Sequence, residues 1–245
     1  MTIESDDDLT ALAAVGRIIR ETLAEMARRL HTGMTTAELD AIGGAMLEAR
    51  GVRSAPRLAY NFPGHTCISV NDEAAHGIPG DRVLCDGDLV NIDVSVERDG
   101  YWVDTGGSFP VGPPSKAVAE LCAHTRAALR KAVFAAKAGR LINAIAKAVE
   151  GEARRGGYNI VDGPAGHGVG RFIHEAPTVA NIYSSADRQH LHEGLVIAIE
   201  PFLTKGSGVI VEADDGWTLK TADGSLAAQY EHSVVITKGN PIILT

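Results

Sequence analysis

A β-hairpin is predicted by the sequence Leu89-Val-Asn-Ile-Asp-Val-Ser-Val96, the turn Glu97-Arg-Asp-Gly100 and a second strand from Tyr101 to Thr105. The first arm is rich in β-branched residues, and a polar, glycine-containing turn between two such arms is typical of a hairpin. Polar and apolar residues alternate along this arm, which indicates one apolar face and one polar face. The sequence therefore places an antiparallel pair of strands inside the fold.

Two aspartates lie within this hairpin. With the turn loop centred between residues 98 and 99, Asp93 and Asp104 would be directly opposed, with Cβ atoms about 5 Å apart. Two like charges repel at that distance, whereas a hard divalent cation would take their oxygen atoms as ligands. A polar outer face explains Asp93 equally well, because Asn91 and Ser95 share its side of the strand. The residues alone leave both interpretations open.

The rest of the chain alternates helical and strand-like segments. Apolar residues at helical spacing, capping residues and glycine stops predict four helices: Asp8 to Leu30, Thr35 or Thr36 to about Gly51, a segment after Pro114, and Leu141 to Arg155. Further strands are predicted at Cys67–Val70, Leu195–Ile199 and Ser233–Ile236. The order of two helices followed by strands occurs twice. It predicts two similar halves that share one α+β core within a single domain, residues 1–245.

The composition is that of an ordinary globular protein with an excess of acidic residues. Among 245 residues there are 23 Lys+Arg and 31 Asp+Glu, a net charge of −8, and 45% are hydrophobic. This balance argues against nucleic acid and anionic membranes as partners, because both require a clustered basic surface. No apolar stretch approaches the roughly 20 residues of a membrane span. With an acidic N-terminal segment and three cysteines without metal-type spacing, the sequence predicts a reduced, cytoplasmic protein.

Two further acids stand at the edges of apolar strands. Glu200 ends the run Leu195-Val-Ile-Ala-Ile-Glu-Pro201, and Glu231 comes just before the predicted strand that begins at Ser233. A carboxylate that is buried without a partner is energetically costly, so each of these acids either reaches solvent or has a partner. Four acids at strand edges favour a metal site over four unrelated surface residues.

Three histidines accompany these acids on loops that contain glycine. His167 and His174 lie seven residues apart in one such loop, and His76 precedes a glycine in another. Glycines allow the close backbone approach that is common around functional sites. A lone loop histidine is usually a surface residue, and His190 and His192 are interpreted that way because their polar surroundings contain no strand or helix. The other three histidines, together with the acids, favour a functional site.

In chain order, seven residues match the pattern of one family: His76, Asp93, Asp104, His167, His174, Glu200 and Glu231. The sequence resembles bacterial type I methionine aminopeptidases over almost the whole chain, from about Leu9 to Ile243. The matching stretches are Asn71–Pro79, Val90–Thr105, Gly166–Pro177, Ala198–Phe202 and Gly216–Ser233. This resemblance implies the pita-bread (creatinase/aminopeptidase) fold, an α+β fold with pseudo-twofold halves around a central antiparallel sheet.

The resemblance also implies a pair of divalent metal ions. Five residues would bind them: Asp93, Asp104, His167, Glu200 and Glu231. Among these, Asp104 and Glu231 would bridge the two ions. Mn, Fe, Co and Zn all tolerate one imidazole and four carboxylates, so the residues do not choose the metal. Such a pair would supply a hydroxide at neutral pH and polarise the scissile carbonyl.

Three residues would carry catalytic roles: His76, His174 and Glu200. Glu200 would move a proton from water to the leaving amine, in addition to binding metal. His174 would donate a hydrogen bond to the developing oxyanion, and His76 would contact the substrate amide or assist the leaving group. Both histidines would therefore also bind the substrate.

The methionine side chain would occupy a small apolar pocket. Four residues stand at the matching positions: Tyr60, Phe62, Cys67 and Trp217. The sequence departs from the family pattern at two pocket positions, where Arg57 and Ile173 replace a cysteine and a phenylalanine of well-known bacterial members. These departures concern the shape of the pocket rather than the metal ligands.

The implied activity is that of a metal-dependent hydrolase that removes the initiator methionine from new proteins and peptides whose second residue is small. A monomer is expected, and a transient contact with the ribosome is compatible with this role. X-Pro aminopeptidases or dipeptidases use the same five ligands, but they resemble this chain preceded by another domain, for which 245 residues leave no room. A catalytically inactive binding protein on the same fold is the third alternative, although such proteins have lost ligands that are all present here.

Overall fold

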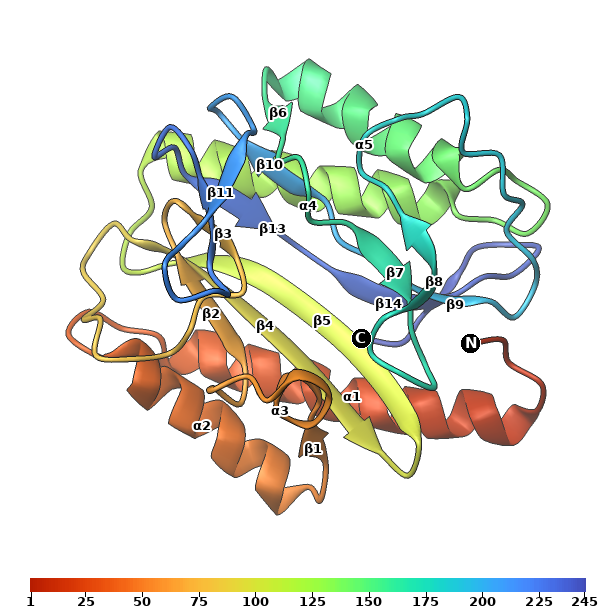
Figure 1. Cartoon of the computed structure of the whole chain (residues 1–245), viewed down its shortest axis with the longest axis horizontal. Helices are drawn as coiled ribbons and strands as arrows, with labels where there is room; N and C mark the ends of the chain where they lie inside the picture. The colour runs from red at the N-terminus through yellow and green to blue at the C-terminus, as the bar shows by residue number, and fades with distance from the viewer.

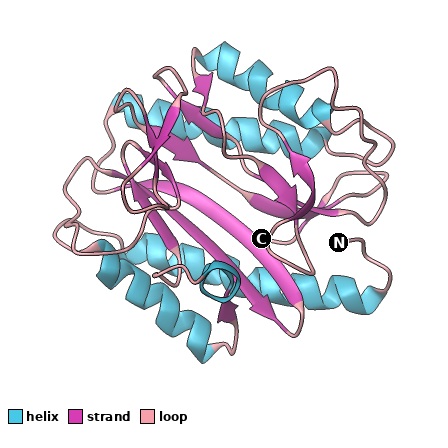
Figure 2. Ribbon diagram, viewed as in Figure 1, coloured by secondary structure: helices cyan, strands magenta, loops and turns pink.

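The computed structural model describes residues 1–245 and shows a layer of strands between two pairs of helices (Figure 1). The first pair is α1 (Asp6–Arg29) and α2 (Thr36–Ala49), and the second pair is α4 (Lys116–Ala135) and α5 (Asn143–Gly156). A short helix, α3 (Ala55–Tyr60), follows the first pair. Coloured by secondary structure, the same view separates the strand layer from the helices that cover it (Figure 2).

The strands of each half pair antiparallel. In the first half, β1 (Arg53–Ser54) and β2 (Cys67–Val70) pair with β4 (Leu89–Arg98), which also pairs with β5 (Tyr101–Pro110). In the second half, the order is β15 (Ile242–Ile243), β14 (His232–Val235), β9 (Val196–Ile199), β7 (Gly166–Gly168) and β8 (Glu175–Val179). Two small sheets complete the layer. One has the order β13 (Ala227–Gln229), β10 (Phe202–Thr204) and β6 (Asn159–Ile160). The other has the order β11 (Ile210–Glu212), β12 (Leu219–Thr221) and β3 (Glu73–Ala75).

The β4–β5 hairpin is present, but its register differs from the predicted one. Arg98 is the partner of Tyr101, so the turn consists of Asp99 and Gly100 alone, with φ angles of 53° and 81°. This two-residue turn shifts the pairing, so that Asp93 and Asp104 are not directly opposed. Asp104 pairs with position 95 and Asp93 with position 106. The two aspartates are diagonal neighbours on the same face of the hairpin.

Strand β5 joins the two halves of the molecule. Its Gly106 carbonyl accepts a hydrogen bond from the backbone N–H of Glu231 (3.0 Å). The hydroxyl of Ser233 accepts a hydrogen bond from the backbone N–H of Asp104 (3.0 Å) and donates one to the backbone carbonyl of Asp104 (2.8 Å). These contacts place two segments that are 129 residues apart in the sequence side by side.

The hydrophobic core follows the division into halves. A cluster of 26 buried residues lies between the first helix pair and β2, β4 and β5, and includes Leu12, Ile19 and Ile92. A second cluster of 24 buried residues includes Leu129 and Ile145 under the second helix pair. The prediction of two halves that share an α+β core is confirmed.

The four predicted helices are present, with small shifts at their ends. Helix α2 has the predicted capping box, in which Thr35 and Glu38 each accept a hydrogen bond from the other's backbone N–H. Helix α5 begins at Asn143 rather than at Leu141. The short helix α3 is missing from the prediction, because six residues are too few to show a helical period. None of the helices combines the length and the apolar composition that crossing a membrane requires.

Candidate metal centre

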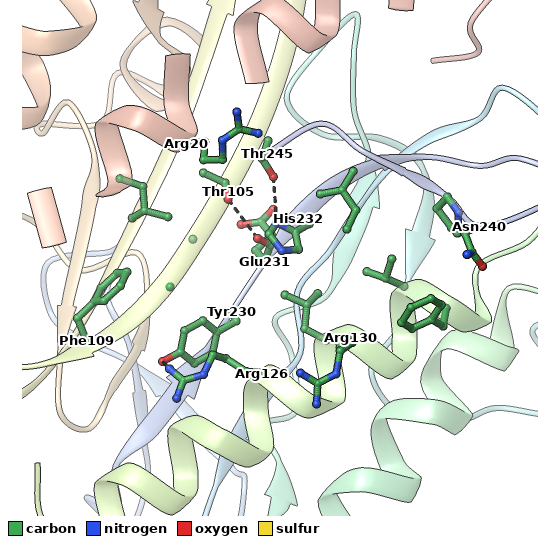
Figure 3. Close-up of a pocket in the computed structure, with 18 residues that line it drawn as sticks. Arg20, Thr105, Phe109, Arg126, Arg130, Tyr230, Glu231, His232, Asn240 and Thr245 are labelled. Atoms are coloured by element: carbon green, nitrogen blue, oxygen red, sulfur yellow. Dashed lines mark hydrogen bonds between the residues drawn. The ribbon is translucent and has the colours of Figure 1, made fainter. Parts of the chain in front are cut away.

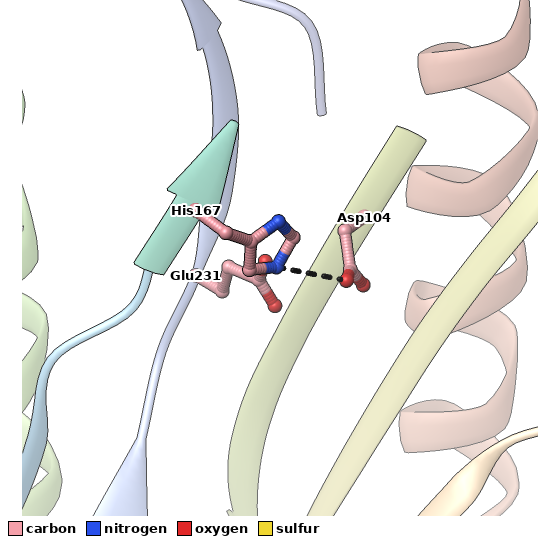
Figure 4. Close-up of side chains that lie close together, drawn as sticks. All are labelled: Asp104, His167 and Glu231. Carbon is pink, nitrogen blue, oxygen red and sulfur yellow. Dashed lines mark ion pairs between the residues drawn. The ribbon is translucent and has the colours of Figure 1, made fainter. Parts of the chain in front are cut away.

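The five predicted metal ligands come from both halves and converge on one buried site. Asp93 lies in β4, Asp104 in β5 and His167 in β7, whereas Glu200 directly follows β9 and Glu231 lies between β13 and β14. The Nε2 atom of His167 is 3.7 Å from Oδ2 of Asp104 and 3.5 Å from Oε1 of Glu200. Ligand atoms of Asp104, His167 and Glu231 all lie within 4.8 Å of one another (Figure 4).

Glycines on both sides of His167 allow β7 to lie close to its neighbours. A Cβ atom added to Gly166 would be 2.3 Å from the carbonyl oxygen of Ala198, and one added to Gly168 would be 2.2 Å from that of Ala176. Any other residue would therefore push β7 away from β8 or β9. The His167 ring is fixed by a 2.9 Å hydrogen bond from Nδ1 to the Gly168 carbonyl, which leaves the Nε2 lone pair directed at the carboxylates.

Burial shifts each carboxyl group of the site toward its protonated form. Burial raises the pKa of Asp93 to about 6. Burial, and next to it repulsion from neighbouring carboxylates, raises the pKa of Asp104, Glu200 and Glu231 well above its usual range. Burial lowers the pKa of His167 to about 4, so the imidazole is neutral at pH 7. Neutral imidazole and paired carboxylates are ligands that divalent cations bind.

Two buried oxygen atoms provide a direct test of whether these residues fit a metal. Oδ1 of Asp104 and Oε1 of Glu231 are buried and have no hydrogen-bond partner. No Lys or Arg forms an ion pair with either carboxylate. Buried polar atoms in folded proteins normally have a hydrogen-bond partner, so these two oxygen atoms lack one that is expected. The residues of the site therefore fit divalent cations.

A hydrogen-bonded chain behind the ligands was missed by the sequence analysis. Nε2 of Gln229 donates to Oε2 of Glu231 (3.2 Å), and Nδ2 of Asn91 donates to Oε1 of Gln229 (2.9 Å). These bonds orient the carboxylate of Glu231 from the side of β4. The only available signal was that Asn91 shares the polar face of its strand with Asp93.

An apolar cavity of about 250 Å³ opens beside the metal ligands. It is lined by all four predicted pocket residues, Tyr60, Phe62, Cys67 and Trp217, and by Asp93, Asp104, His76 and His174. The rings of Phe62 and Trp217 meet edge to face, with centroids 5.2 Å apart. The structure thus brings the predicted substrate-binding residues and the predicted metal ligands Asp93 and Asp104 to one cavity.

The two departures from the family pattern differ in position. Ile173 lines the cavity, whereas Arg57 is exposed, does not line it, and lies 3.0 Å from the Nε2 atom of His65. Two residues of α3 line the cavity, Pro56 and Tyr60. The placement of Arg57 in the pocket was wrong by one residue, which on a helix rotates a side chain by about 100°.

The three predicted functional histidines lie at the site, and the two surface ones do not. His76 has a left-handed backbone (φ 57°) and lines the cavity together with His174. A left-handed backbone at a residue other than glycine is uncommon and is often found at functional positions. His190 and His192 are exposed and lie outside the site, as predicted.

Tyr60 makes a contact that its expected role as a pocket wall does not include. Its hydroxyl lies 2.6 Å from Nδ1 of His174, and the two rings stack with centroids 5.5 Å apart. A phenol that donates to Nδ1 fixes the tautomer in which Nε2 of His174 carries the proton. His174 can then donate a hydrogen bond from Nε2.

Comparisons with known proteins agree with this geometry. A family model described as metallopeptidase family M24 matches residues 10–238. The chain belongs to metallopeptidase family M24. Methionine aminopeptidase 2 of Bacillus subtilis (strain 168) is 47% identical to this M24 chain over 247 residues, which cover 100% of the chain and 99% of that protein.

Solved structures show that the M24 chain has the expected pita-bread fold. The crystal structure of methionine aminopeptidase from Rickettsia prowazekii matches it with a TM-score of 0.96 and 32% identity, covering 100% of both chains. Prolidase from Pyrococcus furiosus shares the fold with a TM-score of 0.80 at 22% identity, but the match covers 65% of the prolidase. The predicted family and the pseudo-twofold α+β fold are both confirmed.

Proposed function

We propose that this chain is a methionyl aminopeptidase that removes the initiator methionine from new proteins and peptides whose second residue is small. The observation that carries the proposal is the apolar cavity of about 250 Å³, whose lining includes Asp93 and Asp104. A cavity of this size suits one unbranched apolar side chain, and the polar groups proposed for hydrolysis belong to its lining. The 47% identity with the Bacillus subtilis aminopeptidase over the whole chain supports the same reaction.

The cofactor we propose is a pair of divalent ions, Co, Mn, Fe or Zn. Five residues would hold them, with Asp104 and Glu231 shared between the ions: Asp93, Asp104, His167, Glu200 and Glu231. Support comes from the unpartnered oxygens of Asp104 and Glu231 and from the raised pKa values of the carboxyl groups. When bound, such ions lower the pKa of water and polarise a carbonyl group.

The residues around the ligands have separate tasks in this proposal. Glu200 carries a proton from water to the leaving amine, a role that suits a buried carboxyl group with a raised pKa. His174 donates from Nε2 to the developing oxyanion, in the tautomer that its contact with Tyr60 fixes. His76 lines the same cavity and contacts the substrate amide or assists the leaving amine.

The substrate preference follows from the shape of the cavity. Its walls of Phe62, Trp217 and buried Cys67 contact the methionine side chain, and Ile173 closes part of the space. Burial of an unbranched thioether side chain of this kind contributes about 2 kcal/mol. The second residue of the substrate then lies toward the metal ligands, where a small side chain avoids collisions.

A pair of tripeptides tests this function. Protein loaded with Mn²⁺ should release methionine from Met-Ala-Ser and leave an X-Pro peptide intact, and a chelator should abolish the release. Cleavage of the X-Pro peptide alone would assign the chain to the proline-directed enzymes. Failure to bind any divalent ion, with no cleavage of either peptide, would assign it to the inactive binding proteins.

We further propose that residues 1–245 act as one catalytic domain, as a monomer, in the cytoplasm. The family match over most of the chain supports the single domain, and the three free cysteines support the reducing cytoplasm. New amino termini are available at the ribosome, so a transient contact with it would serve this activity. Light scattering and co-sedimentation with ribosomes measure these properties directly.

A further inference from the structure

A second and larger cavity, of about 720 Å³, lies between helices α1 and α4 (Figure 3). It shares no lining residue with the two cavities at the metal ligands. Thr105 of β5 lines it, whereas the preceding residue, Asp104, lines the metal side. Successive residues of a strand point to opposite faces, so the large cavity is on the other face of β5 from the metal centre.

Three arginines line this second cavity and none has an acidic partner. Arg20 comes from α1, and Arg126 and Arg130 come from α4. No ion pair forms to any of the three, although the chain carries a net charge of −8. The single acidic side chain in the lining is Glu231, which is only 2% exposed and whose ligand oxygen belongs to the metal cluster. The lining therefore has three guanidinium groups, which outnumber its acidic groups, Glu231 and the terminal carboxylate of Thr245.

One of these guanidinium groups is held in a fixed position. Nη1 of Arg126 donates a 2.7 Å hydrogen bond to the hydroxyl of Tyr230, and its guanidinium carbon is 4.9 Å from the centre of that ring. The Tyr230 hydroxyl in turn donates to the carbonyl of Ser108. A side chain that is already ordered loses little freedom when it binds an anion, so the site is organised in advance.

The remaining lining is largely apolar and comes from both halves of the molecule. Leu129 and Val133 of α4 are buried at its wall, Phe109 of β5 lies on the side away from Asn240, and Phe134 is an exposed residue of the lining. A volume of about 720 Å³ lies within the range of roughly 300–1,000 Å³ that is usual for sites of small organic ligands. Such a lining binds the body of an organic molecule, and the arginines bind its charged group.

We propose that this cavity is a binding site for a small amphipathic organic anion, with its apolar body inside the cavity and its oxyanion head against Arg126 and Arg130, which lie four residues apart on α4. Guanidinium groups bind carboxylate and phosphate oxygens through paired hydrogen bonds, and either head group suits this arrangement. The cavity shares only Glu231 with the proposed metal centre, and its test does not depend on peptide hydrolysis.

Fluorescence titration of the full chain with 8-anilinonaphthalene-1-sulfonate tests binding of an anionic head group and an apolar body together, because the dye has both. The dye should bind saturably, and the uncharged analogue N-phenyl-1-naphthylamine should bind at least about tenfold more weakly, since it lacks the charge-assisted hydrogen bonds. Equal affinity for the two dyes would contradict an anion site.

Variants locate the bound dye. Arg126→Gln and Arg130→Gln should each weaken dye binding about tenfold, whereas Arg17→Gln, an exposed arginine of α1 outside the cavity, should not. Phe134→Glu, which adds a carboxylate at an exposed lining residue (53% exposed), should also weaken binding without affecting folding, as circular dichroism would show. Dye binding that survives all three cavity variants unchanged would place the dye elsewhere and overturn the proposal.

Competition identifies the head group. Octyl phosphate, octanoate or both should displace the dye, and whichever competes at lower concentration names the natural head group. If neither displaces the dye at millimolar concentration, the cavity does not accept amphipathic anions.

Discussion

Two groups of buried acidic side chains in this chain have opposite surroundings. Glu152 of α5 is fully buried, and its carboxylate accepts hydrogen bonds from Lys131 (2.6 Å), His124 (2.7 Å) and Arg155. Although burial alone would raise it, these bonds lower the pKa of Glu152 to about 2. At the metal centre, burial raises the pKa of each carboxyl group, and oxygens of Asp104 and Glu231 have no partner.

The difference separates a structural acid from a candidate functional one. The cations around Glu152 belong to the same polypeptide, so its charge is balanced as soon as the chain folds. No Lys or Arg of the chain pairs with the carboxylates of the candidate metal centre, so in the proposed site cations from solution would balance their charge. Burial alone does not distinguish these cases, whereas the presence or absence of a cationic partner does.

The largest effect is expected for Asp104→Asn at the metal centre. Loss of a proposed bridging ligand should lower the release of methionine by about a thousandfold or more, and the rise in melting temperature on adding Mn²⁺ should disappear. Without metal, the variant should be at least as stable as the metal-free wild type, because one repelling carboxylate is gone. Calorimetry with and without Mn²⁺ measures both properties.

Asp214→Asn, at an exposed aspartate, is the matched control and should behave like the wild type. A metal-free Asp104→Asn protein that is clearly less stable than metal-free wild type would mean that Asp104 has a structural partner after all.

Glu152→Gln should have a smaller effect, and it should lower stability rather than activity. The substitution removes the negative charge that the partners of Glu152 share. Water can partly solvate these partners, because they are partly exposed. We therefore expect a loss of about 2 kcal/mol in the free energy of unfolding. Activity per folded molecule should be unchanged. Urea unfolding compares this variant with Glu120→Gln, which removes an exposed pair to Lys116 (3.8 Å) and should cost close to nothing. Equal losses in the two variants would remove the distinction drawn for Glu152.

The contribution of Glu152 should also depend on pH with a defined sign. Its pKa is lowered from 4.5 to about 2 on folding, so the charged form stabilises the folded state above pH 4.5 and this stabilisation fades as the pH falls toward 2. The difference in unfolding free energy between wild type and Glu152→Gln should therefore be constant near neutral pH and shrink in acid. A difference that grows as the pH falls would have the wrong sign for a lowered pKa.

Tyr60→Phe removes the uncharged hydroxyl that contacts His174 and should have the smallest effect. Without the phenol, His174 is free to adopt the other tautomer, and we expect kcat to fall about tenfold while KM changes little. Tyr183→Phe, at an exposed tyrosine with no side-chain hydrogen bond from its hydroxyl, serves as control. A rise in KM at constant kcat would show that Tyr60 acts only as a wall of the pocket.

Much of the fold could be predicted because it depends on local patterns. The arms of the hairpin and the capping box of α2 are encoded in a few adjacent residues. The hairpin register could not be fixed, because moving the centre of the turn by a single residue slides one arm past the other by two, and only the positive φ of Asp99 settles it.

The site was predictable in its acids and histidines but not in its supporting contacts. Acids such as Glu200 stand out at the end of an apolar run, and the family resemblance assigns a role to each of them. The bond from Asn91 to Gln229 joins residues 138 positions apart, and nothing local indicates which strands will meet. Pro56 was missed because α3 is too short to reveal which of its faces is turned inward.

The seam between β5 and β14 has a consequence for how the protein is made. A chain synthesised as far as residue 200 already contains four of the five proposed ligands, but it lacks Glu231 and the Ser233 hydroxyl that holds the backbone of Asp104. Until those residues leave the ribosome, the other four proposed ligands lack Glu231, and Asp104 lacks the backbone contact that joins β5 to β14. We therefore expect a growing copy of this chain to complete the proposed metal site only when its synthesis is nearly finished.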